Sequence, residues 1–259
     1  MQPFDLSGKS AIITGGNGGI GLAMATALVD ANCGVSIWGR NPEKTEAAAH
    51  KLHDRGGRVQ ALICDVSDRE AVNNSFARAV EKFGRIDGCF VNAGTGGGGR
   101  GSFLHRSIEE WHTMFRTNLD GAFHILQVAA RHMVDNANAG EAGGRLVATS
   151  SIGALFGAAR NEHYGASKAA LNALIRALAV ELARYGITAN AILPGYAETE
   201  MTGELFQNEK FVNAVIPRIP MHRFGKAHDF GGIAVYLMSD ASAYHTADCF
   251  VIDGGYSAC

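Results

Sequence analysis

The sequence has no apolar run near the ~18 residues that a membrane-spanning helix needs. Its opening stretch, MQPFDLSGKS, contains neither the basic region nor the apolar core of a secretion signal. The 5 cysteines are widely spaced without a CxxC pair, and the 10 histidines include no HExxH, so the motifs of common zinc sites and redox dithiols are missing. We therefore expect a cytoplasmic protein with no membrane partner and no metal.

Charge is also scarce and balanced, with 19% charged residues and a formal net charge of −2. This balance argues against electrostatic binding of nucleic acid. Proline is rare at 5 residues, and the hydrophobic fraction of 47% is too high for a disordered chain. We expect one compact domain over residues 1–259 that buries an extensive core.

What the chain does contain is an alternation of short β-type runs and longer helical patterns. The expected strands are mostly continuous apolar runs, typical of strands buried on both faces, and cover residues 10–14, 34–38, 58–63, 86–91, 145–149, 187–193 and 249–252. The expected helices cover residues 20–31, 42–55, 68–83, 108–136, 162–185 and 227–238. This alternation predicts a parallel sheet between two layers of helices, a Rossmann-type three-layer α/β sandwich.

Two segments break the alternation. Residues 94–101 hold six glycines directly after a strand, where open α/β sheets bind ligands, although such a segment also serves as a flexible connection. Residues 198–223 form a mixed segment after Pro194-Gly195. We interpret this second segment as a mobile substrate lid.

The first expected strand runs into TGGNGGIG at residues 14–21 and then into an alanine-rich helix. Gly15 permits a tight turn, Gly19 lets the backbone approach a pyrophosphate, and Gly21 lets helix and strand pack closely. The helix N-terminus would face the anion. The same pattern also occurs as a plain strand-to-helix connection, so alone it is a weak indication of a dinucleotide site.

The residues after the second and third strands are candidates for the adenosine end of such a site. No acid follows the second strand to bind a ribose 2′-hydroxyl, and Arg40 is suited to clamp a 2′-phosphate instead. This favours NADP(H), although an arginine at a strand end is also an ordinary surface residue. Asp65 is placed either to accept a hydrogen bond from the adenine amino group or to flank the next helix structurally.

Small residues and one unusual asparagine follow. Asn92-Ala93-Gly94 come directly after the fourth strand and let the backbone pass beside a cofactor. Asn118 lies inside an expected helix, where asparagine is unfavourable. It indicates a specific hydrogen bond or a local kink, unless it is simply a tolerated polar residue.

Ser151 follows the fifth strand, and Tyr164 and Lys168 lie on one face of the next helix. A free tyrosine has a pKa near 10, so acid or base chemistry near neutrality requires that pKa to fall by a few units. Lys168 and a cationic nicotinamide together would lower it, and Ser151 would orient a substrate carbonyl. A lone YxxxK pair equally marks a solvated helix face. His163, beside Tyr164, is interpreted as either a substrate contact or a surface residue.

Taken in order, these motifs resemble those of the short-chain dehydrogenase/reductase family over essentially the whole chain. TGGNGGIG is similar to the family's TGxxxGIG cofactor turn, and Asn92 begins its NAG motif. Pro194-Gly195 followed by Thr199 resembles PGxxxT, whose backbone and threonine hold the nicotinamide carboxamide. The resemblance implies a seven-stranded parallel sheet. The similarity of the final VIDGG run to the family's last strand implies a homotetramer.

The resemblance also implies roles for single residues. The catalytic tetrad corresponds to Asn118, Ser151, Tyr164 and Lys168, in which the asparagine holds a water in a proton relay from lysine, through the ribose hydroxyls, to tyrosine. The implied cofactor-binding residues are Gly15, Asn17, Gly18, Gly19, Ile20, Arg40, Asp65, Val66, Asn92, Ala93, Gly94, Tyr164, Lys168, Pro194, Gly195, Ala197 and Thr199. The match to NADP(H) selection is incomplete, because the turn GGNGG carries no second basic residue, so NAD(H) use stays open.

We expect an NAD(P)-dependent oxidoreductase, such as a carbonyl reductase, that transfers a hydride reversibly between the cofactor and an alcohol/carbonyl pair. In reduction, Tyr164 would donate the proton and Ser151 would hydrogen-bond the carbonyl oxygen. We expect a small-molecule substrate. Its binding walls are expected at residues 95–102 and 153–163, at Tyr196 and in the lid. These walls are compatible with three substrate classes, namely sugar-type polyols, secondary alcohols and 3-oxoacyl thioesters. Two alternatives are a non-catalytic NADP(H)-binding sensor and an epimerase or dehydratase of this fold.

Overall fold

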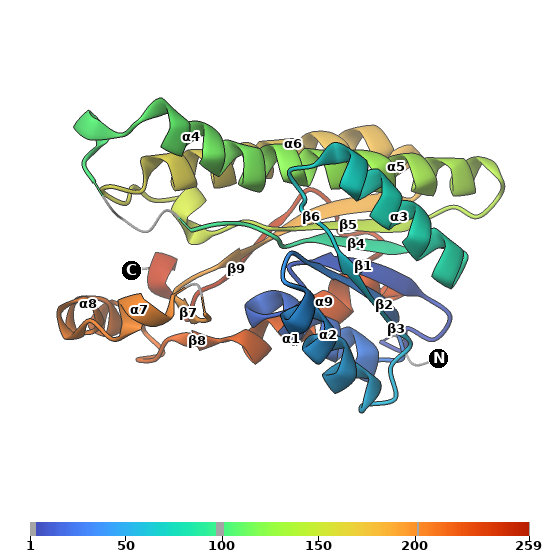
Figure 1. The fold of residues 1–259 in the computed structure, drawn as a ribbon, viewed down its shortest axis with the longest axis horizontal. Helices are drawn as coiled ribbons and strands as arrows, with labels where there is room; N and C mark the ends of the chain where they lie inside the picture. Colours follow the sequence, from blue (N-terminus) through green and yellow to red (C-terminus); the bar gives the residue numbers. More distant parts are fainter. Residues whose placement is uncertain (1–3, 97–100, 201, 259) are drawn as a thin grey trace.

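A parallel sheet of seven strands runs through the middle of the computed structural model, which describes residues 4–96, 101–200 and 202–258. The strands are β1 (Ser10–Thr14), β2 (Gly34–Gly39), β3 (Val59–Ile63), β4 (Gly88–Val91), β5 (Gly144–Thr149), β6 (Ile187–Pro194) and β9 (Cys249–Ile252). They pair in the order β3-β2-β1-β4-β5-β6-β9, and every pair is parallel (Figure 1). The predicted seven-stranded Rossmann-type sheet is confirmed.

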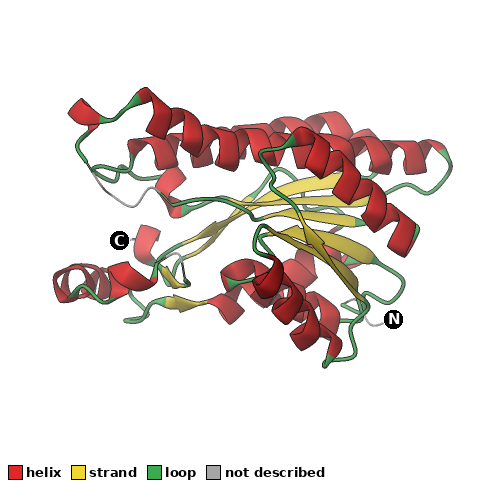
Figure 2. Ribbon diagram, in the orientation of Figure 1, coloured by secondary structure: helices red, strands yellow, loops and turns green. Residues whose placement is uncertain are grey.

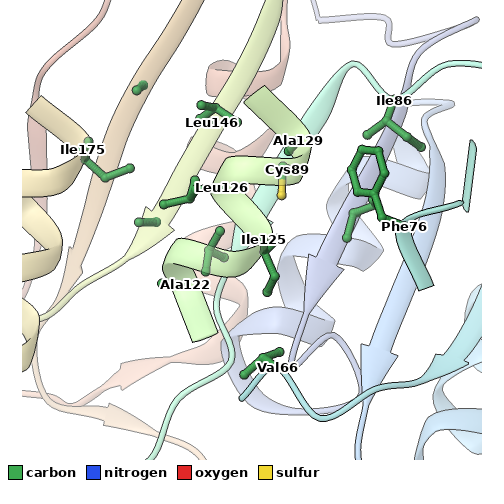
Figure 3. Packing of buried hydrophobic residues seen from close by; sticks show 14 of the residues in the cluster. Val66, Phe76, Ile86, Cys89, Ala122, Ile125, Leu126, Ala129, Leu146 and Ile175 are labelled. Atoms are coloured by element: carbon green, nitrogen blue, oxygen red, sulfur yellow. The ribbon is translucent and has the colours of Figure 1, made fainter. Parts of the chain in front are cut away.

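Helices cover both faces of this sheet, as Figure 2 shows. One layer contains α3 (Arg69–Phe83), α4 (Ile108–Phe115), α5 (Gly121–Asn138) and α6 (Glu162–Leu182), and the other contains α1 (Gly19–Asp30), α2 (Pro42–His53) and α9 (Gly231–Met238). Phe76 of α3, Ile125 of α5 and Leu146 of β5 belong to one buried apolar cluster (Figure 3). Met24 of α1 and Leu237 of α9 belong to a second, on the opposite face. The predicted three-layer sandwich is therefore present.

The strand order reverses at β1. The chain proceeds from β1 to β2 and β3 on one side, and β4 then pairs with the other side of β1. In open α/β sheets, ligands bind at the carboxyl ends of the strands that flank such a reversal. The reversal thus places the glycine turn after β1 and the Asn92-Ala93-Gly94 motif after β4 at the edge where a ligand is expected.

The single helix expected over residues 108–136 is interrupted in its first half. α4 begins with a capping box, in which Glu110 N donates to Ser107 Oγ at 3.1 Å. A π-helical turn at Arg116–Asp120 then joins α4 to α5. Such turns break the regular backbone ladder and are frequent at functional sites. Because Asn118 lies in this turn, the kink that its position indicated is present.

The segment expected to form a lid, residues 198–223, has regular structure of its own. Its elements and their immediate neighbours are β7 (Ala197–Glu198), α7 (Gly203–Phe206), α8 (Glu209–Val215) and β8 (Gly225–Lys226). β7 and β8 pair in parallel and hold the two ends of the segment together. Phe206 and Phe224 stack with their ring centroids 4.1 Å apart. An aromatic cluster therefore stabilises this part of the chain from within.

No helix within the described ranges is both long enough and apolar enough to cross a membrane. Within the glycine-rich stretch at residues 94–101, residues 97–100 lie outside the part that the structure describes.

Candidate active site

A cavity of about 450 Å³ opens at the carboxyl ends of β1, β2, β4, β5 and β6. Every residue that the sequence assigned to catalysis or cofactor binding lines this cavity, except Asn118, whereas residues 153–163 and Tyr196 of the expected substrate walls do not line it. The lining set comprises Gly15, Asn17, Gly18, Gly19, Ile20, Arg40, Asp65, Val66, Asn92, Ala93, Gly94, Ser151, Tyr164, Lys168, Pro194, Gly195, Ala197 and Thr199. The parallel sheet thus brings residues from seven separate stretches of the chain to one place.

The glycine turn after β1 leaves no room for side chains. Gly15 has φ +63° and Gly19 has φ +50°, a backbone region that favours glycine. A Cβ added to Gly21 would lie 2.3 Å from Gly15 O and 2.5 Å from Asn92 Nδ2. The Asn92 amide in turn donates to Thr14 O at 3.2 Å. The start of α1 is therefore held against the end of β4, as expected from its glycines.

This turn fits the pyrophosphate of a dinucleotide. Gly18 caps α1 without a side chain, and the first turn of α1, which the structure describes completely, contains no acidic residue. The amide groups at such a helix start lack intrahelical partners and carry partial positive charge. Together with the free space above the glycines, they form an anion cradle at the bottom of the cavity.

At the adenosine end of the cavity, Arg40 is exposed directly after β2. Asp65 also lines the cavity, but one of its oxygens is used by the next turn. Asp65 Oδ1 accepts from Ser67 N at 2.9 Å and from Ser67 Oγ at 2.8 Å. The bonds from Ser67, together with the nearby charge of Arg40, lower the pKa of Asp65, so it carries negative charge at neutral pH. The structural role that the sequence offered for Asp65 is therefore present, and its hydrogen bond to adenine stays a prediction.

Lys44 and Glu200 also line this end of the cavity, and sequence reasoning missed both. They form an ion pair between the first turn of α2 and the segment after β7. The sequence pattern for NADP(H) selection places a second basic residue only within the glycine turn itself. The asparagine-proline start of α2, which places Lys44 on a fixed first turn, was the available signal.

Tyr164 and Lys168 meet at the opposite end of the cavity. Lys168 Nζ lies 5.8 Å from the centroid of the Tyr164 ring, and it donates to Thr149 O at 2.8 Å. Lys168 is only 5% exposed. Burial lowers the pKa of Lys168 to about 8, because the charged ammonium loses its hydration. Lys168 therefore loses its proton only slightly above neutral pH.

The pKa of Tyr164 moves in the opposite direction from the one that acid–base work requires. Burial raises the pKa of Tyr164, and the hydrogen bond with Ser151 only opposes that increase. Ser151 Oγ also accepts from Gly153 N at 3.0 Å, which fixes the serine beside the phenol. Burial and Ser151 together therefore favour the protonated phenol, and lowering this pKa is left to the positive charges of Lys168 and of a bound nicotinamide.

Asn118 lies behind the cavity wall and is 1% exposed. Its Oδ1 accepts from Thr95 N at 2.8 Å, and its Nδ2 donates to Thr95 O at 3.0 Å and to Ser167 Oγ at 3.2 Å. A Cβ added to Gly94 would lie 3.1 Å from Asn118 Oδ1 and 3.5 Å from Lys168 Nζ. The asparagine therefore holds the chain after β4 in place beside the lysine.

His163 is not the surface residue that one interpretation of the sequence proposed. It is 3% exposed, and its Nδ1 is buried without a hydrogen-bond partner among the described residues. It does not line the cavity either. Its neighbour Glu162 accepts from Arg106 Nε at 3.0 Å. Burial, together with the charge of Arg106, lowers the pKa of His163 and favours the neutral ring.

In the part of the chain that the structure describes, no group of three histidine, cysteine or acidic side chains is placed to hold a metal ion. The cavity therefore presents glycine backbone and cations at one end, and a serine, a tyrosine and a lysine at the other. This arrangement suits a bound dinucleotide whose reactive ring lies beside a polar reacting group.

Comparison with known proteins agrees with this arrangement. A family model described as "Enoyl-(Acyl carrier protein) reductase" matches residues 15–257. The 3-oxoacyl-[acyl-carrier-protein] reductase FabG of Chlamydia pneumoniae is 34% identical over 251 residues, which cover 96% of this chain and 97% of that protein.

Two crystal structures are similar over almost the whole chain. A short-chain type dehydrogenase/reductase from Mycobacterium marinum has a TM-score of 0.92 and 34% identity, covering 99% of this chain and 98% of that one. A gluconate 5-dehydrogenase from Burkholderia cenocepacia J2315, solved in complex with NADP and tartrate, has a TM-score of 0.92 and 31% identity, with the same coverage.

Proposed function

This chain belongs to the short-chain dehydrogenase/reductase family and is an NAD(P)-dependent oxidoreductase, and we propose that it transfers a hydride reversibly between NADP(H) and an alcohol/carbonyl pair. The observation that carries this proposal is a single cavity with an anion cradle at one end and Ser151, Tyr164 and Lys168 at the other. The named relatives are dehydrogenases and reductases, and none favours the sensor alternative.

The residues divide the work between binding and proton transfer. The bound nicotinamide supplies or accepts the hydride. In reduction, Ser151 donates a hydrogen bond to the carbonyl oxygen, and Tyr164 gives its hydroxyl proton to that oxygen. Lys168, anchored on Thr149 O at 2.8 Å, holds positive charge near the phenol below pH about 8. Positioning of this kind contributes about 7–11 kcal/mol to lowering a reaction barrier.

The remaining site residues hold the reaction geometry. Asn118 fixes the backbone of Thr95, and with it the wall beside Lys168. Pro194, Gly195 and Thr199 line the cavity after β6, where they are placed to bind the nicotinamide carboxamide. We assign the proton relay to Lys168 and Tyr164, with Asn118 as a positioning residue for that relay.

We propose NADP(H) as the preferred cofactor. No acid follows β2, and the exposed Arg40 is suited to a 2′-phosphate. The neighbour from Burkholderia cenocepacia was solved with NADP. NAD(H) remains the alternative, since no basic residue lies within the glycine turn.

Among the three open substrate classes, exposed apolar side chains on and beside the expected substrate walls favour ketones and secondary alcohols with an apolar body, or 3-oxoacyl thioesters, over polyols. Leu155 and Phe156 are exposed in a hollow that Tyr164 also lines. Met221 of the lid segment and Phe103 and Leu104, just after residues 95–102, are exposed as well. Arg106 ties the chain after Leu104 to the segment that contains Phe156, because its Nη2 donates to Arg160 O at 3.0 Å. In Figure 1 the start of α4 and the start of α6 lie at the same end of the molecule as α7 and α8.

We also propose that the protein assembles as a homotetramer. Ala169, Ala173, Ala177 and Val180 are exposed on one face of α6, and Val180 is 80% exposed. Val251 on the edge strand β9 is exposed as well. Exposed apolar side chains on two separate elements fit a tetramer with two kinds of interface. Sedimentation equilibrium of the purified protein measures this directly.

The experiment that tests the reaction is Tyr164→Phe, with Tyr244→Phe at a fully exposed site as the matched control. We expect kcat to fall by about 10²–10⁴-fold because the proton donor is removed. The dissociation constant for NADPH should change by less than about twofold, because the phenyl ring keeps the cavity wall. Unchanged turnover in Tyr164→Phe would contradict the mechanism.

A further inference from the structure

Two oppositely charged side chains meet across the adenosine end of the cavity. Lys44 and Glu200 form an ion pair, and both line the cavity. The pair joins positions 156 residues apart in the sequence, so no local pattern predicts it. It lies away from Ser151, Tyr164 and Lys168 in the sequence and takes no part in the proton transfer proposed above.

The ammonium of Lys44 lies over the glycine turn. A Cβ added to Gly18 would be 2.7 Å from Lys44 Nζ. The backbone of Lys44 is fixed at the start of α2, where its N donates to Asn41 Oδ1 at 2.9 Å. Lys44 thus brings a cation from another helix to the position that a basic residue within the turn would reach. With Arg40 after β2, two cations flank this end of the cavity.

Glu200 is held at the same place by the turn after β7. Thr202 Oγ1 accepts from Thr199 N at 3.0 Å and donates to Ala197 O at 2.7 Å. These bonds fix the backbone on either side of Glu200. Its carboxylate therefore stays close to Lys44, while its side chain is largely exposed to solvent.

We propose that Lys44 and Arg40 together bind the 2′-phosphate of NADP(H), and that Glu200 limits the preference for this cofactor by competing for Lys44. The inference rests on the proposed use of a nicotinamide dinucleotide. A 2′-phosphate carries about −1.5 to −2 charges near neutrality, whereas the 2′-hydroxyl of NAD(H) carries none. Only NADP(H) therefore has to displace the Glu200 carboxylate from Lys44, and only its 2′-phosphate is repelled by that carboxylate. Glu200 thus weakens the binding of NADP(H) selectively.

The test is calorimetric binding of NADPH, NADH and two fragments, adenosine 2′,5′-bisphosphate and 5′-AMP, which differ only in the 2′-phosphate. Lys44→Met should weaken NADPH and the bisphosphate about five- to tenfold and change NADH and 5′-AMP less than twofold. Glu200→Gln should tighten NADPH and the bisphosphate about two- to fivefold, again without effect on NADH. Lys51→Met on α2 and Glu209→Gln on α8 make the same charge changes at exposed positions outside the cavity.

The double variant shows whether the two side chains act on each other. If Glu200 acts through Lys44, Glu200→Gln should have less than half of its effect in the Lys44→Met background. Equal weakening of NADPH and NADH by Lys44→Met would overturn the proposal and make the pair a structural tie between α2 and β7. The proposal would also be overturned if Lys51→Met and Glu209→Gln changed NADPH affinity as much as Lys44→Met and Glu200→Gln do. Failure of the wild type to bind either cofactor would instead overturn the proposed function, and the inference with it.

Discussion

At the cofactor end of the cavity glycine backbone forms much of the wall, whereas the segments expected to bind the substrate are irregular and carry exposed side chains. In β1 and β2 every residue is buried. At Gly21 and Gly39 an added Cβ would come within 2.5 Å of a neighbouring atom. In contrast, nothing lies within 4 Å of a Cβ added to Gly157 or Gly203, and Leu104 is 82% exposed.

This difference shows how one fold serves a fixed cofactor and a changeable substrate. A cofactor bound by backbone groups requires glycine at particular positions, so the sequence itself reveals the site. A substrate bound by side chains on connecting segments requires only that those segments start from rigid elements. The segment after β5 does so, because Ser151 is anchored on Gly153 N while Leu155 and Phe156 are exposed.

The largest effect that this comparison predicts is from Gly21→Ala, with Gly157→Ala as its counterpart at the substrate end. The new methyl group in Gly21→Ala would meet Gly15 O at 2.3 Å, so the turn must move. We expect NADPH affinity to fall at least about 30-fold and the unfolding free energy to fall by about 1–3 kcal/mol. Calorimetry and urea unfolding measure the two quantities.

Gly157→Ala should change both quantities within error, because its added methyl group meets open space. Equal damage from both substitutions would remove the distinction between the two ends. An undamaged Gly21→Ala would show that the cofactor turn tolerates displacement, and the backbone would then not determine the cofactor site.

Lys168 lies where the two ends meet, and it gives the next effect in size. Its pKa of about 8 in the folded protein lies below the ~10.4 of a free lysine. Between these two values the unfolded chain binds a proton that the folded protein lacks. The unfolding free energy therefore gains up to about 1.4 kcal/mol per pH unit from this group as pH rises from about 8 to 10.4. Below pH 8 the contribution is constant.

Urea unfolding at pH 8, 9 and 10 tests this in the wild type, in Lys168→Met and in the exposed control Lys51→Met. Other groups titrate in the same range, so the quantity to compare is the change in unfolding free energy per pH unit in the wild type and in each variant. This change should be smaller in Lys168→Met and the same as in the wild type in Lys51→Met. Identical changes in all three would mean that Lys168 is hydrated, and that the cavity end beside Tyr164 is open to water.

Much of the fold followed from the sequence, because buried parallel strands are continuous apolar runs. All seven strands begin and end within two residues of their expected bounds. The helix expected over residues 108–136 was less accurate. At its break, Arg116–Asp120, Asn118 is hydrogen-bonded to Thr95, 23 residues away. The regular spacing of apolar residues predicts helix on both sides of such a break, but it carries no information about the tertiary hydrogen bonds at the break.

The candidate site, like the fold, has parts that local sequence patterns predict and parts that depend on tertiary structure. The glycine turn and the Tyr164–Lys168 pair are local patterns, and the structure places both on one cavity. Lys44 and Glu200 were missed because their meeting depends on the path of the chain between α2 and β7. The sequence predicts His163 either on the surface or in contact with the substrate, yet its side chain is buried in the folded protein. Burial of a side chain at a helix start depends on neighbouring elements that its own sequence does not specify.

The smallest effect is expected from Phe156→Ser at the substrate end, with Tyr244→Ser as a control at a fully exposed aromatic position. Phe156 is 44% exposed, and its ring packs edge-on against Tyr256 at 6.4 Å between centroids. If an apolar substrate covers part of its open face, removal of the ring should cost about 1 kcal/mol of binding. KM for apolar ketones should then rise about three- to tenfold, while kcat and NADPH affinity stay within about twofold. A turnover panel of ketones, polyols and oxoacyl thioesters measures this. An equal rise in KM for polyols would show that the ring supports the loop rather than contacting apolar substrates, and a fall in NADPH affinity would show that the two ends of the cavity are not independent.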